Sequence, residues 1–376
     1  MSFGIYVHYP YCARVCPYCD FNVVARHSIP HQRYADAILT ELDSRALEFT
    51  DRGDVVSIYF GGGTPGLWPA DQIGRVLDGI RVHFSLASDA EITIELNPED
   101  ATEDGFRDLS EIGVNRMSLG AQSFQPALLQ KLGRQHTQDD IVNAIRWARL
   151  ASINNISVDL LYGHIGHGLE SSLEDVKRAV GLGAKHISTY QLTIEDKTLF
   201  GREFEMGINR LEPESHLLDM FRSIRRFLVD AGYSTYEISS AARPGYRSQH
   251  NLVYWTGRDY LALGAGAHGF YRTDSGEGIR WGNICSPERY MDAVEAGRPT
   301  EQFKQTSTGQ DLQEELLMMG LRMEEGLLVT EPMKAYFADN ADRCARLGLI
   351  VIEGGRWRVS ARGQEILDAV TLEMIS

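Results

Sequence analysis

The sequence lacks any run of eighteen or more apolar residues, so it predicts no membrane-spanning helix. It also lacks an excess of basic residues, because 37 Lys and Arg stand against 52 Asp and Glu and leave a net charge of −15. Such an acidic surface repels phosphate backbones and offers no polybasic face, which argues against nucleic-acid partners and against electrostatic attachment to a membrane. The N-terminal segment has no basic flank, long apolar run or small-residue cleavage site, so we expect a cytoplasmic protein.

Cysteine is scarce as well. Five cysteines in 376 residues are too few, and odd in number, for a disulfide framework. Three of them, Cys12, Cys16 and Cys19, fall within eight residues, which is the pattern of a ligand cluster. Cys285 and Cys344 stand alone, and we interpret them as small hydrophobic side chains.

The chain is long for one compact core, and its first half alternates β-rich segments with amphipathic stretches. The predicted strands cover residues 4–9, 55–60, 91–96, 114–119, 156–162 and 186–192. The predicted helices between them cover residues 31–49, 69–83, 103–112, 137–150 and 173–182. This alternation indicates parallel strands joined by right-handed crossovers. Six units are too few for an eight-stranded barrel, so an open barrel and a doubly wound sheet both fit.

Glycine-rich and polar motifs come directly after three of these strands, at residues 61–65, 97–98 and 120–123. Functional residues of βα barrels gather at the carboxyl ends of the strands, where several loops meet at one mouth. We therefore favour an α/β fold in which about six strands form a partial, open βα barrel.

The pattern changes after residue 205. A long helix is predicted over 213–231 and a short strand over 233–238, and a polar, glycine-rich region follows them. Helices recur from residue 309. They are followed by a two-stranded wing with Gly354 and Gly355 at its tip. We expect three parts: residues 1–205 as the barrel, 206–305 as its extension, and 306–376 as a winged-helix-like α+β module. A winged-helix-like unit would ordinarily suggest DNA binding, and its wing carries Arg356 and Arg358, but its many carboxylates argue against that function.

The three clustered cysteines suit an iron–sulfur centre. Three thiolates bind three irons of a cubane and leave the fourth iron without a protein ligand, whereas most such clusters take four. The amino and carboxylate groups of S-adenosylmethionine fill such a position. Zinc remains an alternative, with His8 or His27 completing a tetrahedron, although structural zinc sites usually have paired Cys-x-x-Cys knuckles.

The segment Cys12-x-x-x-Cys16-x-Tyr18-Cys19 resembles the signature of the radical S-adenosylmethionine superfamily. Residues 6–12 and 19–21, Tyr-Val-His-Tyr-Pro-Tyr-Cys and Cys-Asp-Phe, resemble its HemN-like branch. That branch contains the oxygen-independent coproporphyrinogen III dehydrogenases and the HemW haem chaperones. Matching motifs extend from residue 4 to about residue 270.

The resemblance implies a set of residues around S-adenosylmethionine. The loop at 61–65, Gly-Gly-Gly-Thr-Pro, is expected to contact its methionyl amino group, and the loop lacks the Gly-Lys-[Ser/Thr] ending of a nucleotide phosphate loop. Arginine suits the carboxylate because its guanidinium forms bidentate hydrogen bonds. The expected binding residues are Tyr6, Gly62, Gly63, Thr64, Glu95, Gln122, Arg134 and Asp159.

A second motif is His250-Asn251-x-x-Tyr254-Trp255, which resembles the HNxxYW motif of HemW proteins. Imidazole is a common haem ligand, and aromatic rings pack on porphyrin faces. The resemblance makes His250 the first candidate for haem contact and His268 a distant second. The alternative is a packed loop in which His250 makes a structural hydrogen bond.

Two departures from the branch bear on substrate. The dehydrogenases carry a fourth cysteine where this chain has Phe21, which argues against coproporphyrinogen oxidation and for the HemW group. Relatives commonly read Tyr-Gly-Leu-Pro-Gly-Gln where residues 162–167 here read Tyr-Gly-His-Ile-Gly-His, so a loop at the barrel rim differs.

Three functions follow from these patterns. The first is a HemW-like chaperone that binds a [4Fe–4S] cluster, S-adenosylmethionine and haem, and delivers haem to respiratory enzymes. The second is a radical enzyme such as coproporphyrinogen III dehydrogenase, in which a 5′-deoxyadenosyl radical attacks a porphyrinogen. The third is a zinc-stabilised barrel without redox chemistry. For the first two, the resemblance implies a flavodoxin or ferredoxin as electron donor.

Overall fold

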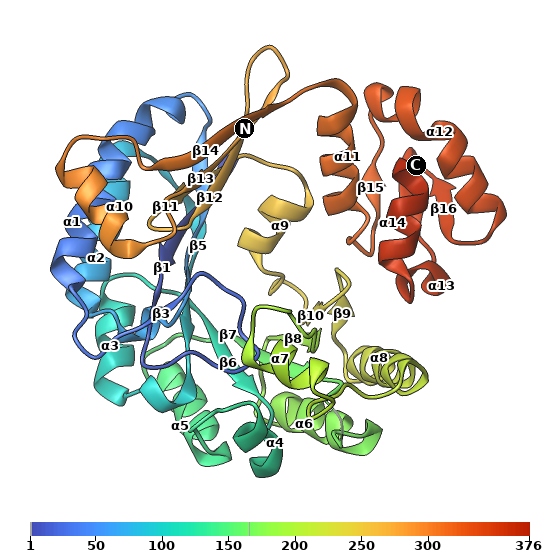
Figure 1. The fold of residues 1–376 in the computed structure, drawn as a ribbon, viewed down its shortest axis with the longest axis horizontal. Helices are drawn as coiled ribbons and strands as arrows, with labels where there is room; N and C mark the ends of the chain where they lie inside the picture. The colour runs from blue at the N-terminus through green and yellow to red at the C-terminus, as the bar shows by residue number, and fades with distance from the viewer. Residues whose placement is uncertain (1, 165) are drawn as a thin grey trace.

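A computed structural model describes residues 2–164 and 166–376 of the chain and is built around one curved twelve-stranded sheet (Figure 1). Along the sheet the strands run β14-β13-β12-β11-β1-β4-β5-β6-β7-β8-β10-β9. The six predicted strands are confirmed as β1 (Ser2–Tyr9), β4 (Asp54–Gly62), β5 (Leu86–Leu96), β6 (Arg116–Gln122), β7 (Asn155–Tyr162) and β8 (His186–Gln191). They lie side by side in sequence order, all parallel. Within the described residues the edge strands β14 and β9 do not pair, so the barrel is open and a doubly wound order is excluded.

Helices cover the outer face of this sheet, as Figure 1 shows. They are α1 (His31–Arg45), α2 (Ala70–His83), α3 (Glu103–Glu111), α5 (Gln138–Leu150), α6 (Leu169–Gly181) and α8 (Glu214–Asp230). Each was predicted, although α6 begins four residues earlier than expected. The parallel strands are buried on both faces, as β1 illustrates with six of its eight residues buried, because helices outside and side chains inside both cover them.

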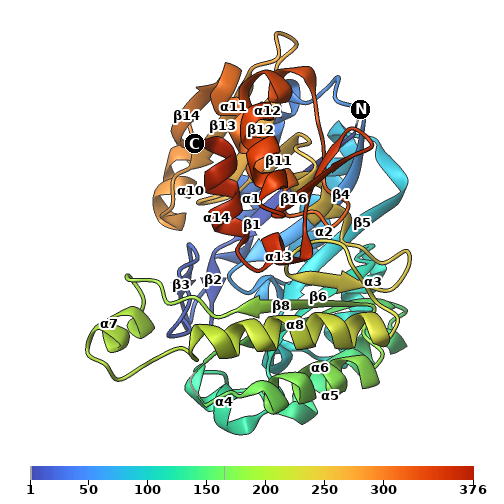
Figure 2. The same ribbon diagram turned by 90° about the vertical axis from the view of Figure 1, so that its right-hand side faces the viewer.

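Shorter elements complete the first half. The cysteine loop lies between two short parallel strands, β2 (Tyr11–Cys12) and β3 (Val24–Ala25). Further short helices are η1 (Ala46–Glu48), η2 (Pro65–Leu67), η3 (Pro98–Asp100), α4 (Pro126–Lys131) and α7 (Leu199–Glu205). Figure 2 shows α7 projecting from the body of the molecule. At the β8 edge, β10 (Ser240–Ala242) and β9 (Ser234–Thr235) add in antiparallel fashion, so the strand predicted over 233–238 is much shorter than expected.

The opposite edge of the sheet was not predicted. Here β11 (Tyr260–Leu263) pairs in parallel with β1, and β12 (His268–Arg272), β13 (Gly278–Asn283) and β14 (Glu301–Ser307) follow in antiparallel order. The region between β10 and β11 contains α9 (Gln249–Trp255), a short helix on the concave side of the sheet (Figure 1). Helix α10 (Pro287–Glu295) packs beside α1.

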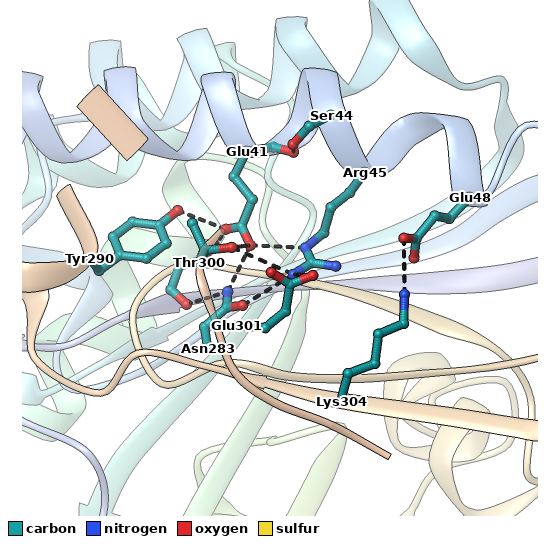
Figure 3. Close-up of polar contacts among 10 residues, drawn as sticks. Glu41, Ser44, Arg45, Glu48, Asn283, Tyr290, Thr300, Glu301 and Lys304 are labelled. Carbon is teal, nitrogen blue, oxygen red and sulfur yellow. Dashed lines mark hydrogen bonds and ion pairs between the residues drawn. The ribbon is translucent and has the colours of Figure 1, made fainter. Parts of the chain in front are cut away.

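A buried carboxylate fastens this edge to the barrel (Figure 3). Glu41 on α1 forms an ion pair with Arg45, 2.9 Å away, and both side chains are almost fully buried. The same carboxylate accepts hydrogen bonds from Tyr290 Oη, Gly264 N, Asn283 Nδ2 and Thr300 Oγ1, at 2.7–3.1 Å. Such saturation offsets the desolvation of a buried charge. One side chain of α1 therefore joins β13, α10 and the segment before β14 to the barrel.

The C-terminal part has its own core. It comprises α11 (Gly309–Gly320), β15 (Leu327–Leu328), α12 (Glu331–Arg346), β16 (Ile350–Glu353), β17 (Arg356–Val359), α13 (Ala361–Gln364) and α14 (Leu367–Ile375). Leu317, Phe337 and Trp357 are among the buried residues that it packs together. The predicted wing is present, and both Gly354 and Gly355 take positive φ at its turn, as a two-residue hairpin requires. The strand β15 makes the wing three-stranded. No helix within the described residues is both long and apolar enough to cross a membrane.

Candidate functional site

The three clustered cysteines line one cavity of about 450 Å³ at the carboxyl ends of the parallel strands. We call it the cysteine cavity. Cys12 ends β2 and is buried, while Cys16 and Cys19 follow in a turn closed by a 3.1 Å hydrogen bond from the Cys19 amide to the Cys16 carbonyl. Burial, with a smaller contribution from the neighbouring thiols and against the hydrogen bond from Thr64, raises the pKa of Cys12 to about 11. The Cys12 thiol must therefore release its proton when it ligates iron.

The arrangement suits a cluster better than a single ion. Among the residues that the structure describes, no group of three or more His, Cys, Asp or Glu side chains is arranged to hold one metal ion. A cubane needs no such convergence, because each thiolate ligates a different iron. The donor set, three thiols beside an open cavity, fits a [4Fe–4S] group.

The glycine loop adjoins the cysteines. Gly63 N donates to the Tyr9 carbonyl at 2.8 Å, and a Cβ on Gly63 would lie 2.7 Å from the Tyr11 carbonyl oxygen, so only glycine fits there. Thr64, which is buried, donates its hydroxyl hydrogen to Cys12 Sγ at 3.5 Å. The loop thus packs directly against the first cysteine.

Glu95 closes the other side of the glycine loop. Its carboxylate accepts hydrogen bonds from Tyr59 Oη at 2.7 Å and from Gly62 N at 3.0 Å, with Gly62 at a φ of +114°. Burial raises the pKa of Glu95 to about 7, although both hydrogen bonds act in the opposite direction. This carboxyl therefore changes charge near neutral pH.

Arg134 is held in place from two sides. Its Nη1 donates to Asn97 Oδ1 at 2.6 Å, and its Nε and Nη2 donate to Tyr18 Oη at 3.2 and 2.8 Å. Tyr18 belongs to the cysteine loop, so the cation is fixed beside the thiols. A guanidinium in this position can pair with the carboxylate of a ligand.

Two further predicted residues line the same cavity. Asp159 on β7 accepts hydrogen bonds from Ser118 Oγ at 2.7 Å and from Ser157 Oγ at 3.1 Å. Gln122, at the end of β6, has a φ of +63° where the pairing register between β6 and β7 shifts. A non-glycine residue held in the left-handed region is often a sign of functional strain. Of the eight residues predicted for S-adenosylmethionine, the structure brings seven together here: Gly62, Gly63, Thr64, Glu95, Gln122, Arg134 and Asp159.

Tyr6, the eighth, lies in the wall of a neighbouring cavity of about 580 Å³. Its Oη contacts His8 Nδ1 at 2.9 Å, and its ring stacks on Tyr59. We call this second space the aromatic cavity. It lies between β1, α9, β12, β13 and α11, and its wall includes Tyr254, Trp255, Tyr260, His268, Phe270 and Met319. Phe21, Gly62 and Glu95 line both cavities, so the two adjoin.

His250 lies between the two cavities. Only 1% of it is exposed, its Nδ1 is 2.9 Å from Ser57 Oγ, and its Nε2 is 2.8 Å from Tyr254 Oη. Burial, reinforced by Arg116, lowers the pKa of His250 to about 3, so the ring is neutral. His250 thus makes structural hydrogen bonds, as the alternative interpretation of this motif expected. Asn251 of the same motif lines the cysteine cavity, whereas Tyr254 lines the aromatic one.

A distant carboxylate fixes the orientation of α9. Glu91 on β5 accepts hydrogen bonds from Gln249 N at 3.1 Å and from His250 N at 3.2 Å. Glu91 also lies near Arg116 on β6. The Arg116 Nε is 3.6 Å from the Glu91 carboxylate and makes no hydrogen bond within residues 2–164 and 166–376. Sequence reasoning missed both residues, although a charged side chain inside an apolar strand is a detectable signal.

Of the two departures from the family pattern, one lines the cavities. Phe21, where a fourth cysteine would stand, is 67% exposed at the junction of the two cavities. His164 and His167 are buried, and His167 Nε2 lies 3.2 Å from Asp175 Oδ2 on α6. Ile165 of this segment lies outside the described residues.

The chain is similar to known proteins over most of its length. Residues 6–179 match the Radical SAM superfamily profile, and residues 307–366 match the HemN C-terminal domain. The chain is 38% identical to the heme chaperone HemW of Escherichia coli strain K12 over 301 residues, which cover 79% of this chain and 78% of that protein. It is 34% identical to heme chaperone HemW of Bacillus subtilis strain 168, covering 86% and 84%, and 31% identical to that of Mycobacterium tuberculosis strain H37Rv, covering 99% and 95%.

A solved structure shows the same fold. The coproporphyrinogen III oxidase HemN from Escherichia coli, a radical SAM enzyme, superposes with a TM-score of 0.83 at 22% sequence identity. The superposition covers 100% of this chain and 90% of that one. The open barrel and the C-terminal module therefore occur together in a known architecture.

Proposed function

Since the chain belongs to the HemW family of the radical SAM superfamily, we propose that it is a haem chaperone which binds a [4Fe–4S] cluster, S-adenosylmethionine and haem, and delivers the haem to haem-requiring respiratory proteins. The observation that carries this proposal is the pair of adjoining cavities, one lined by three thiols and one by aromatic side chains. We further propose that the transfer takes place in the cytoplasm, the compartment expected from the sequence.

Cys12, Cys16 and Cys19 would hold three irons of the cluster. The residues that share their cavity offer what S-adenosylmethionine requires: a cation at Arg134 for the carboxylate, and acceptors at Glu95 and Asp159 for hydroxyl or amino hydrogens. When bound and reduced, the cluster supplies one electron to the sulfonium. That role calls for a donor such as flavodoxin or ferredoxin.

Haem, or a related porphyrin, is the proposed cargo. The HNxxYW motif supports this because Tyr254 and Trp255 line the aromatic cavity, next to the proposed cofactor site, and His250 contacts the Tyr254 hydroxyl. The volume of about 580 Å³ falls within the roughly 300–1,000 Å³ typical of ligand pockets.

Coproporphyrinogen III dehydrogenation is the alternative. The fold shared with the Escherichia coli HemN structure is compatible with it, but a fold does not determine an activity. Phe21 at the junction of the cavities weighs against it, because the dehydrogenase branch carries a cysteine at that position.

One experiment distinguishes the haem chaperone from the coproporphyrinogen III dehydrogenase. Protein reconstituted anaerobically with iron and sulfide is titrated with haem, and the same sample is assayed for 5′-deoxyadenosine and for porphyrin products. The chaperone proposal predicts a Soret band that saturates at a fixed haem-to-protein ratio, with coproporphyrinogen III left unconverted. Formation of protoporphyrinogen IX would contradict it, as would the absence of any saturable haem binding.

A further inference from the structure

The aromatic cavity contains one histidine whose ring nitrogens are both unpaired. His8 contacts Tyr6 Oη through Nδ1 and the Asn22 carbonyl through Nε2, at 2.9 Å each. His250, which lies behind Tyr254 of the cavity wall, also has a contact at each ring nitrogen, with Ser57 Oγ and with Tyr254 Oη. The imidazole of His268 on β12 makes no hydrogen bond within the described residues, and His268 is exposed to solvent.

A free imidazole is the condition for binding iron. Burial and the nearby Arg280 lower the pKa of His268, which keeps the ring in the neutral form that ligates metals. Its ring lies edge-on to Phe303, with centroids 5.3 Å apart, and this contact leaves the nitrogens unoccupied. His268 is thus available without the loss of a protein contact, whereas His250 would have to give up Ser57 or Tyr254.

The rest of the wall suits a flat, apolar macrocycle with charged edges. Tyr254 packs edge-on against Tyr260, with centroids 4.6 Å apart, and Phe270 lies next to Tyr260. Trp255 adds an indole whose Nε1 has no hydrogen-bond partner in the described chain. Aromatic side chains stack on other ring systems, so this wall offers surfaces on which a porphyrin can pack.

Two cations lie at the same cavity. Arg258 is exposed, and its guanidinium makes one hydrogen bond within the described residues, a long one of 3.4 Å to Ser2 Oγ. Arg280 on β13 contacts Tyr260 Oη and pairs with Glu315 on α11. Haem carries two propionates, and arginine is well suited to pair with carboxylates.

We propose that the aromatic cavity is the haem-binding site, with His268 as an iron ligand and with Arg258 and Arg280 pairing with the propionates. The inference rests on the proposed function, since it takes haem as the cargo. His250 is then a positioning residue: it acts through Tyr254, whose hydroxyl it holds, and does not touch the iron. Because Gly62 and Glu95 line both cavities, the bound haem lies next to the S-adenosylmethionine site.

The test compares four variants of the full-length, cluster-loaded protein: His268→Ala, His268→Met, His250→Ala and, as a matched control on the exposed face of α8, His216→Ala. Haem is titrated against each, the spectrum of the cluster is subtracted, and the iron ligands are identified by electron paramagnetic resonance.

We expect His268→Ala to weaken haem binding at least tenfold and to remove the imidazole signature. His268→Met should bind haem with a thioether signature in its place, which no general loss of folding would produce. His250→Ala should weaken binding by a smaller factor and keep the imidazole signature, and His216→Ala should match the wild type.

Two results would overturn the inference while leaving the proposed function intact. One is wild-type haem binding and spectra in His268→Ala, and the other is loss of the imidazole signature in His250→Ala alone. Failure of the wild-type protein to bind haem at all would instead refute the proposed function, and the inference with it.

Discussion

The Nε2 of His250 lies 2.8 Å from the hydroxyl of Tyr254, and the two rings stand nearly perpendicular, at 83°. The two residues are one helical turn apart on α9, so a single turn links a buried imidazole to the wall of the aromatic cavity. Within the motif of this chain, the imidazole of His250 therefore holds the ring of Tyr254 in its orientation. The following predictions test the sites on both sides of it.

Replacing any one of Cys12, Cys16 and Cys19 by alanine should prevent stable reconstitution of the cluster. Three thiolates are the only protein ligands proposed, and the loss of one leaves two irons without a protein ligand. Iron and sulfide content after anaerobic reconstitution, together with visible absorption, measure this. Cys285→Ala is the matched control, because Cys285 is exposed and outside the cavity, and it should load like the wild type. Full cluster content in a loop variant would contradict the assignment.

Arg134→Lys should lower the affinity for S-adenosylmethionine by about ten- to hundredfold, which corresponds to roughly 1.5–3 kcal/mol for a charge-assisted hydrogen bond. Lysine keeps the charge but loses the planar fork that contacts Asn97 and Tyr18. Equilibrium dialysis on protein of equal cluster content gives the affinity. Arg107→Lys, on the exposed face of α3, should bind like the wild type. Equal affinities for the two variants would rule out this role for Arg134.

Glu95 should make the protein less stable as pH rises from about 4.5 to about 7. Its pKa in the folded state is raised to about 7 from the ordinary 4.5, so the folded state keeps a proton that the unfolded state has already lost. Unfolding is then increasingly favoured across that window, and the full penalty is present above it. Glu95→Gln removes the titration. The difference in unfolding free energy, variant minus wild type, should therefore increase with pH; a constant difference would contradict the shifted pKa.

Glu41→Ala should cost about 3–5 kcal/mol of stability, because it leaves the buried Arg45 without its carboxylate. The matched control is the ion pair between Glu48 and Lys304, which Figure 3 also shows. Glu48 pairs with Lys304 at 3.4 Å in a partly exposed position, so Glu48→Ala should cost no more than about 1 kcal/mol. Urea unfolding followed by circular dichroism compares the two. Similar losses in both variants would mean that the Glu41 network does not hold the sheet edge.

Arg258→Gln should weaken the binding of haem about tenfold but leave the binding of haem dimethyl ester unchanged. The ester lacks the propionate charges that Arg258 is proposed to meet, so the variant and the wild type become equivalent toward it. Fluorescence quenching of the tryptophans gives both affinities. Arg346→Gln, at the exposed end of α12, serves as the charge-matched control. An equal loss with both ligands would point to a packing effect instead.

The sequence predicted the barrel well because its signals are local. Each predicted strand is a short apolar run followed by an amphipathic helix, and the motifs follow the strand ends, so seven of the eight residues expected for the cofactor meet in the cysteine cavity. Tyr6 is the exception: it lies on β1, in the wall of the aromatic cavity, on the same face of the strand as His8.

Long-range pairing set the limit of prediction. The outer edge of β1 pairs with β11, with Gly4 opposite Tyr260. Neither segment contains a sequence signal from which this pairing could be predicted. The helix α9 is seven residues long and depends on Glu91, 159 residues before His250, to bind its N-terminal amides. Such elements owe their position to tertiary contacts rather than to local propensity.

The pairing of β1 with β11 also has a consequence for synthesis. Residue 260 leaves the ribosome 256 residues after residue 4, which at ordinary elongation rates is a delay of roughly 10 to 50 s. During that interval the first strand can join β4, but its other edge stays open, and open strand edges invite pairing between chains. The hydrogen bond from Thr300 to the Glu41 carboxylate likewise cannot form until Thr300 has been synthesised. The nascent barrel is therefore most vulnerable to aggregation before its last third has been made.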